Sequence, residues 1–186
     1  YVVRPTIDKD AEIIHILESV KGSAIVYVRS RKRTKEISDL LEANGIPSTF
    51  YHAGLTHSTK DIRQQRWHND ETRVMVATNA FGMGIDKPDV RMVIHYDSPD
   101  SIEAYFQEAG RAGRDGKRAY AVLLYDKRDT QKLIKRIDTN FPPKDYIIKV
   151  YEDLAYYYQI AAGSGYGHTF SFEIEKFCHS FKHYPL

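Results

Sequence analysis

Residues 24–45 read AIVYVRSRKRTKEISDLLEANG, and this stretch decides the fold. It opens with five apolar residues, the length and composition of a buried strand. Ser30 then stands where a helix N-cap is expected. Asn44-Gly45 supplies the left-handed position that ends a helix near Ala43. The stretch therefore predicts one strand followed by one helix.

The same alternation continues along the chain to about residue 138. Short apolar, β-rich runs are separated by helix-like stretches, and the strands are expected at Ala24–Val28, Thr49–Tyr51, Val74–Ala77, Met92–Tyr96 and Ala121–Tyr125. Strands that alternate with helices usually form a parallel sheet covered by helices on both faces. We therefore predict an α/β fold with a mostly parallel sheet flanked by helices.

The helix after the fourth strand carries both start and stop signals. Asp100 and Glu103 have the spacing of a capping box, and Gly110 is expected to stop the helix. Its apolar residues recur at i, i+3, i+4 and i+7, which is typical of a buried face; they are Ile102, Tyr105, Phe106 and Ala109.

The sequence changes character at Phe141-Pro142-Pro143. Helices are expected from Lys144 to about Ile160 and over Ile174–Phe181, with a glycine-rich turn between them. This tail is too short to close a core of its own. We interpret residues 1–138 as one domain and residues 139–186 as the helical start of a following, winged-helix-like module.

Composition excludes several protein classes. The 27 basic and 25 acidic residues give a net charge of +2, too balanced to indicate nucleic-acid binding by itself. One cysteine, Cys178, excludes an internal disulfide and a multi-cysteine zinc site, and favours a reducing cytoplasmic setting. No apolar run approaches the ~20 residues of a membrane span. The start lacks a signal-peptide core and an initiator Met, as expected of a fragment or a processed chain.

Residues 107–117, QEAGRAGRDGK, hold the highest concentration of residues suited to binding a ligand. Arg111 and Arg114 stand three apart on a glycine-bounded segment and could present planar donor forks to phosphate. A solvated basic loop explains these residues equally well. A Walker A loop is excluded, because that pattern needs Gly at 111 and Ser or Thr at 118, and both positions are Arg.

Three further segments directly follow predicted strands. Residues 29–35 are basic at five of seven positions, residues 51–55 contain His52, and residues 76–86 are glycine-rich. Ligands of parallel sheets bind at the carboxyl ends of strands. Each segment alone could be an ordinary solvated turn or helix face. We expect these three, together with residues 107–117, to gather on one rim of the sheet.

A metal site is considered near the C-terminus and rejected. His179 and His183 have i, i+4 spacing beside Cys178. Structural zinc, however, takes four ligands, usually with paired cysteines. Cys178 also lies in an apolar helical stripe with Phe177 and Phe181.

Together the motifs resemble those of the second RecA-like lobe of RecQ-family DNA helicases. The resemblance rests on residues 24–36, 51–55, 74–97 and 105–117 and covers roughly residues 1–138. DEAD-box proteins share this lobe but usually place His-Arg where this chain has Glu108-Ala109, which disfavours an RNA helicase. The family's first lobe and its four-cysteine zinc module are absent. The tail is similar to that of zinc-less bacterial members.

The resemblance implies which residues act. ATP with Mg²⁺ would sit between this lobe and the missing first lobe, which would hold the Mg²⁺; no zinc is expected. Arg114 would be the arginine finger, with Arg111 as the second catalytic residue. The nucleotide would be bound by Gly84, Asp86, Gln107, Arg111 and Arg114. The backbone of one DNA strand would be held by Arg29, Ser30, His52, Ala53, Gly54, Thr78 and Asn79.

The function implied is that of the second motor lobe of an ATP-dependent DNA helicase of repair and recombination. The lobe would translocate along single-stranded and forked DNA together with the first lobe of its own chain. It would work in the bacterial cytoplasm, associated with the nucleoid and without a membrane partner. The fragment alone should not hydrolyse ATP. The alternative is a nucleic-acid-binding regulatory domain without a nucleotide role.

Overall fold

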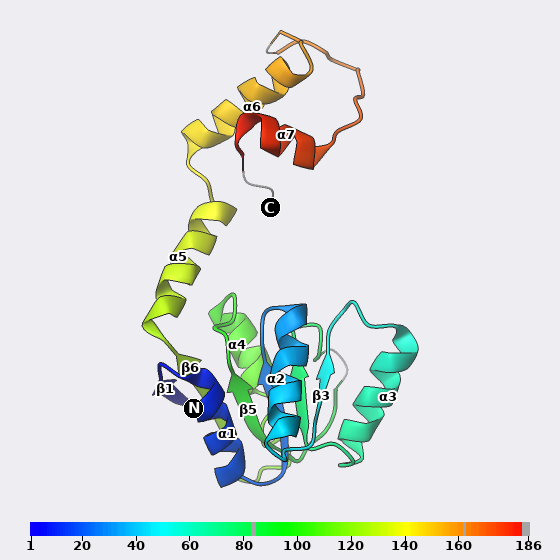
Figure 1. The fold of residues 1–186 in the computed structure, drawn as a ribbon, viewed down its shortest axis with the longest axis vertical. Coiled ribbons are helices and arrows are strands. Elements are labelled where there is room, and N and C mark those ends of the chain that lie inside the picture. The colour runs from blue at the N-terminus through cyan, green and yellow to red at the C-terminus, as the bar shows by residue number, and fades with distance from the viewer. Residues whose placement is uncertain (83–84, 162, 184–186) are drawn as a thin grey trace. The chain divides into compact units, whose positions relative to one another are not determined.

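The computed structural model describes residues 1–82, 85–161 and 163–183. The chain divides into two compact units, Tyr1–Asp129 and Thr130–Leu186 (Figure 1). The domain boundary expected near residue 138 stays a prediction about where the following module begins.

The first unit is built on one six-stranded sheet in the order β1-β6-β5-β2-β4-β3. Every pairing in it is parallel. The strands are β1 (Val2–Pro5), β2 (Ser23–Tyr27), β3 (Ser48–Tyr51), β4 (Val74–Ala77), β5 (Val90–His95) and β6 (Tyr120–Tyr125). The predicted α/β fold with a parallel sheet is confirmed.

Helices cover both faces of the sheet, so its central strands are buried throughout. On β2, Ala24 and Val26 belong to a core formed with α1 (Lys9–Ser19) and α2 (Arg31–Ala43). The alternate residues Ile25 and Tyr27 belong to a second core on the opposite face, with Trp67 of α3 (His57–His68). Burial on both faces explains why these strands read as continuous apolar runs rather than as alternating patterns.

Strand β1 was missed by sequence analysis, which also did not place α1 or the helix Lys127–Asn140. All four residues of β1 are exposed, so no buried apolar pattern marks them. The strand exists because its backbone pairs with β6, with Val3 opposite Leu123.

The start of α4 (Ile102–Ala109) differs from the prediction. Its N-cap is Ser101, whose side chain accepts a hydrogen bond from the amide of Ala104 at 3.2 Å. Asp100 is instead paired with the guanidinium of Arg29. The helix ends before Gly110, as predicted.

The predicted buried stripe on α4 is wrong at two of its four positions. Ile102 and Phe106 are 67% and 55% exposed, whereas Ala109 is 2% exposed. The reason is that α4 packs on β5 through the side that carries Tyr105 and Ala109 only, and the Tyr105 ring lies 4.8 Å from that of His95. The Phe106 ring lies 6.0 Å from that of Tyr1 and 5.7 Å from that of Tyr105.

The second unit is helical. Helix α5 (Lys127–Asn140) begins in the first unit, and α6 (Lys144–Tyr157) and α7 (Ile174–Phe181) follow, which confirms the two helices expected there. The Tyr157 ring lies 5.6 Å from that of Phe177, so aromatic contacts join α6 to α7. His183 is buried, and its Nε2 lies 2.8 Å from a carboxylate oxygen of Asp153. This contact gives His183 a packing role in the unit.

In the described ranges, no group of three or more His, Cys, Asp or Glu residues could hold a metal ion. None of the helices within those ranges has the length and apolar content needed to cross a bilayer.

Candidate nucleotide and nucleic-acid site

Three of the predicted segments meet at the carboxyl edge of the sheet, the upper edge in Figure 1. They follow β2, β3 and β4, which are neighbours and parallel. Backbone hydrogen bonds continue past the strands, from the Val28 amide to the Ala77 carbonyl at 2.9 Å and from the Thr78 amide to the Tyr51 carbonyl at 3.2 Å. The sheet therefore brings the Arg29, His52 and Asn79 segments together.

Arg29 is held in place by the segment after β5. Its backbone amide donates to the Asp97 carboxylate at 3.0 Å, and its guanidinium donates to the Ser98 carbonyl at 3.2 Å. Asn79 is exposed and lines the same small pocket as Arg29 and Asp97. Thr78 is only 7% exposed. Arg29 and Asn79 thus present fixed donors at this edge.

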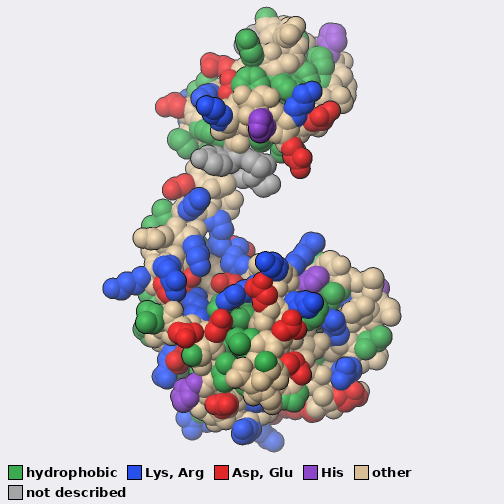
Figure 2. All heavy atoms as spheres, in the orientation of Figure 1, with side chains coloured by type: hydrophobic (Ala, Val, Ile, Leu, Met, Phe, Trp, Pro, Cys, Tyr) green, Lys and Arg blue, Asp and Glu red, His purple; other side chains and the backbone are tan. Residues whose placement is uncertain are grey.

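A basic groove lies beside these donors, over the first turns of α2. Its lining residues are Arg31, Lys32, Lys35, Glu36, Asp39, Phe50 and His52. Figure 2 shows Lys and Arg side chains along the upper rim of the first unit, near the start of α2. Ser30 is the N-cap of α2, but its side chain makes no capping hydrogen bond. The hydroxyl therefore remains available to a ligand.

Gly54 allows Arg31 and His52 to approach the backbone closely. A Cβ at position 54 would lie 3.0 Å from Nη1 of Arg31 and 3.3 Å from Nδ1 of His52. That Nδ1 is buried, and none of the described residues gives it a hydrogen-bond partner. Burial, followed by the charges of Arg31 and Arg63, holds the pKa of His52 below its ordinary value. Ala53 and Gly54 are exposed.

The 107–117 segment begins at that rim and then leaves it. Glu108 lines the same pocket as Arg29 and Asn79, whereas residues 113–115 lie at the amino edge, so the expectation that all four segments share one edge holds only for the start of this one. The Gly113 amide donates to the Val90 carbonyl at 2.9 Å, and the Asp115 amide donates to the Pro88 carbonyl at 3.1 Å. Both carbonyls lie at the amino end of β5. The reason is topological: β6 runs parallel to β5, so the segment that leads into β6 must reach the amino edge.

Arg111 lies flat against the glycine-rich segment that follows β4. A Cβ at Gly82 would collide with the Arg111 guanidinium, so a side chain there would displace the arginine from this position. The Nε of Arg111 is buried, and the described part of the chain offers it no hydrogen-bond partner. Beneath it, the Tyr27 hydroxyl donates to the Phe81 carbonyl at 3.0 Å, and burial raises the pKa of this phenol.

Arg114 extends toward the same segment. Its Nη1 donates to the Ile85 carbonyl at 3.1 Å and lies 3.6 Å from a carboxylate oxygen of Asp86. The side chains of Arg114 and Asp86 are 40% and 90% exposed, so both remain accessible to a ligand. Gln107 is exposed on α4. Gly84 lies outside the described residues.

A pair that sequence analysis missed lies under α4. His95 is fully buried at the end of β5, and its Nε2 lies 2.9 Å from Oε2 of Glu108. Its ring also stacks on Tyr27 at 5.6 Å. A histidine inside an apolar strand was the available signal, but its partner could be found only once α4 was placed over β5.

The family of the chain follows from this geometry and from one comparison. The profile of the helicase conserved C-terminal domain matches residues 8–116. The chain belongs to this family. In this helicase C-terminal domain, the matched residues include the sheet edge at Arg29 and both arginines of the 107–117 segment.

Curated relatives of the domain are RecQ-like helicases. RecQ-like DNA helicase BLM of Xenopus laevis is 47% identical over 116 residues, which are 62% of this chain and 8% of that protein. ATP-dependent DNA helicase RecQ of Bacillus subtilis is 44% identical over 123 residues, 66% of this chain and 21% of that protein. These relatives confirm the resemblance to the RecQ family. The chain spans less than a quarter of their length.

Solved structures confirm the RecA-like lobe. The Escherichia coli DEAD-box protein SrmB, bound to RraA, has a TM-score of 0.65 and 27% identity, covering 75% of this chain and 84% of that one. A DEAD-box protein of Methanococcus jannaschii has a TM-score of 0.63 at 24% identity, covering 77% of this chain and 39% of that one. The second likeness concerns the fold alone.

Proposed function

We propose that this domain acts as the second motor lobe of a RecQ-type ATP-dependent DNA helicase, with Arg114 as its arginine finger. The observation that carries the proposal is the placement of Arg111 and Arg114 on one short segment that faces residues 81–86. Both guanidiniums lie beside a turn that follows a strand. Two planar donor groups so placed suit a polyphosphate better than a single anion.

The residues fit a nucleotide. The buried Nε of Arg111 has no partner in the described ranges, and an anionic oxygen would supply one. Arg114 is partly exposed and held by the Ile85 carbonyl, a long 3.5 Å bond to the Gly110 carbonyl and one loose ion pair, so it could turn toward a transferring phosphoryl group. ATP would supply the phosphoryl transfer that drives the motor. Mg²⁺ would be held by a first lobe, and zinc has no role in the proposal.

The carboxyl edge of the sheet would hold one DNA strand. Arg29, Asn79 and the basic groove of α2 offer donors suited to phosphate oxygens, as does the free Ser30 hydroxyl. His52, Ala53, Gly54 and Thr78 complete the proposed set. Phosphate contacts position a protein without reading sequence. The substrate would be single-stranded or forked DNA, moved as the cleft between the lobes closes on ATP and reopens after hydrolysis.

The isolated chain is not expected to hydrolyse ATP, because the groups that cradle the phosphates and hold Mg²⁺ would come from the first lobe. The decisive experiment therefore uses the full-length helicase that contains this domain. Arg114→Ala should lower DNA-stimulated ATP turnover about 10³-fold or more, while ATP binding changes far less, because the arginine acts on the transition state. Arg114→Lys should not restore turnover, since lysine lacks the planar fork.

Arg118→Ala is the matched control. Arg118 is an exposed arginine four residues further on, with its guanidinium over the Tyr120 ring at 5.2 Å. Its loss removes the same charge from the same segment and should leave turnover within about threefold of the wild type. Near-normal turnover in folded Arg114→Ala protein would instead favour a nucleic-acid-binding regulatory domain without a nucleotide role.

A further inference from the structure

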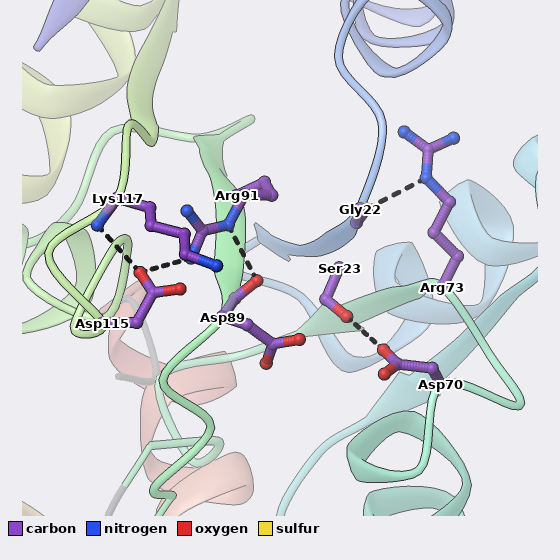
Figure 3. Close-up of a pocket in the computed structure, with 8 residues that line it drawn as sticks. All are labelled: Gly22, Ser23, Asp70, Arg73, Asp89, Arg91, Asp115 and Lys117. Carbon is purple, nitrogen blue, oxygen red and sulfur yellow. Dashed lines mark hydrogen bonds and ion pairs between the residues drawn. The ribbon is translucent and has the colours of Figure 1, made fainter.

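The amino edge of the sheet carries a polar pocket on the far side from Arg29 and Asn79. Figure 3 shows its lining, in which two arginines, Arg73 and Arg91, bind backbone carbonyls. The two are alike in burial and in the kind of group they bind. Their connections differ, because only Arg91 reaches the segment that carries Arg114.

Arg91, in the first half of β5, joins that strand to the 107–117 segment. Its Nη2 lies 2.6 Å from Oδ1 of Asp115, and its Nη1 donates to the Arg118 carbonyl at 3.1 Å. Its Nε donates to the Asp89 carbonyl at 3.0 Å. The two side chains of the ion pair are 18% and 21% exposed, so it is partly buried. One guanidinium thus ties the start of β5 to both Asp115 and Arg118.

The aliphatic part of the Arg91 side chain packs against Gly22. A Cβ at Gly22 would collide with the Cγ of Arg91, and Gly22 has a φ of +99°, which side chains other than glycine rarely adopt. The glycine before β2 therefore makes room for Arg91. The guanidinium is held by its bonds and the stem by this close approach.

Backbone hydrogen bonds hold the residues on both sides of Arg114. The residue before it, Gly113, bonds to the Val90 carbonyl, and the residue after it, Asp115, bonds to the Pro88 carbonyl. Asp115 also accepts a hydrogen bond from the Lys117 amide at 3.1 Å. The backbone of Arg114 is therefore held on both sides, and on its Asp115 side the side-chain bond to Arg91 adds to the backbone bond.

We propose that Arg91 is a positioning residue for Arg114, acting through Asp115 from outside the nucleotide cleft. This inference rests on the proposed function of Arg114 as the arginine finger. An arginine finger stabilises the transition state only when its guanidinium reaches the charge that develops on the phosphoryl group. A displacement of about 1 Å, even one caused far from the reacting atoms, can lower the rate about 10²-fold. The Arg91–Asp115 pair holds the loop against such a displacement.

The test compares Arg91→Ala with Arg73→Ala in the full-length helicase. Arg73 donates to the carbonyl of Gly22 at 3.1 Å and to that of Val20, so its loss disturbs the same pocket without touching residues 107–117. We expect Arg91→Ala to lower kcat for ATP about 10²-fold with KM changed far less. Arg73→Ala should leave kcat of the folded protein within about threefold.

A double variant separates positioning from general damage. If Arg91 acts through Arg114, then adding Arg91→Ala to Arg114→Ala should lower kcat little further, because the group being positioned is already gone. If the kcat of the double variant falls by the product of the two single-variant losses, the inference is overturned. An inactive Arg114→Ala beside an active Arg91→Ala would also overturn it, while leaving the proposed function intact. An active Arg114→Ala would remove the basis of both.

A structural readout does not depend on activity. In this chain, Arg91→Ala should increase hydrogen exchange at the amides of Gly113, Asp115 and Lys117, and Arg73→Ala should not. Should Arg91→Ala fail to fold, Asp115→Asn keeps the shape of the pair and removes its charge. Asp115→Asn should then lower kcat less than the roughly 10²-fold expected for Arg91→Ala, and it should also speed hydrogen exchange at the Lys117 amide. Unchanged kcat and exchange in a folded variant would contradict the positioning role.

Discussion

Gly54 shows how one missing methyl group shapes the proposed DNA edge. It lets the Arg31 guanidinium and the His52 imidazole lie together over the backbone. Burial, and after it the closeness of the Arg31 charge, disfavours a positive charge on the imidazole, so the pKa of His52 falls. An approaching phosphate would reverse that penalty, because an opposite charge favours the protonated imidazole.

His52 should therefore make DNA binding depend on pH. Its pKa in the free chain lies below the ordinary ~6.5, and a bound phosphate raises it. Binding then takes up a proton, so affinity should increase as the pH falls from about 7.5 to 5.5. Fluorescence anisotropy with a short single strand at fixed salt measures this. His52→Asn should flatten the pH dependence.

His57→Asn is the control for that measurement. His57 is an exposed histidine of α3, paired with Asp61 and outside the proposed DNA edge. Its replacement should leave the pH dependence as it is in the wild type. An equal pH dependence in His52→Asn protein would show that other groups cause it.

At the level of helices and strands, the pair of His95 and Glu108 joins β5 to α4. The carboxylate is 13% exposed and faces a fully buried imidazole at 2.9 Å. A partner removed from such a pair leaves the other group buried and unsatisfied, at a cost of about 1–3 kcal/mol. This contact fixes the helix that leads into Arg111.

His95→Phe should accordingly lower the free energy of unfolding of the first unit by about 1–3 kcal/mol. The single tryptophan, Trp67, is fully buried in that unit, so its fluorescence in urea reports on that unit alone. Glu103→Gln, a change on the exposed start of α4, should shift the transition by less than about 0.5 kcal/mol. Equal shifts in the two variants would contradict the role given to the pair.

The buried strands could be predicted from the sequence, and the exposed strand β1 could not. The strands β2 to β6 were predictable because four of them carry largely buried apolar runs and β3 adjoins a turn signal. Strand β1 was not, because pairing with β6 alone holds it. The cap of α4 was misplaced because Asp100 bonds to Arg29, 71 residues away.

The same limit applied to the candidate site. Motif residues such as Arg111 and Arg114 stood out by type and spacing. Their supports did not, since the link of Arg91 to Asp115 joins residues 24 apart, and its geometry follows from strand order. The separation of residues 113–117 from the DNA edge likewise required the parallel direction of β6.

For the molecule as a whole, a net charge of +2 hides an uneven distribution. Arg31, Lys32 and Lys35 line one groove at the carboxyl edge. Binding through such a groove releases counterions from DNA, so it is sensitive to salt and indifferent to sequence.

The isolated chain should therefore bind single-stranded DNA weakly, with affinity falling steeply between about 50 and 200 mM salt. The double variant Arg31→Glu, Lys32→Glu should weaken binding and reduce the slope of log affinity against log salt. Lys21→Glu with Lys176→Glu changes the net charge equally, at exposed positions that do not line the groove, and should have a much smaller effect. Tight binding that ignores salt would contradict the proposed DNA edge.

The parallel sheet has a mechanical consequence. Asn79 follows β4 at the carboxyl edge, whereas Gly113, next to the proposed finger Arg114, bonds to Val90 at the amino end of β5, and β2 lies between these two strands. Tension between DNA and nucleotide then runs along the strands and loads the hydrogen bonds of neighbouring strands in shear. Those hydrogen bonds share the load instead of opening one after another. Under the proposed function, the sheet would therefore transmit the movement of the closing cleft to the DNA without deforming.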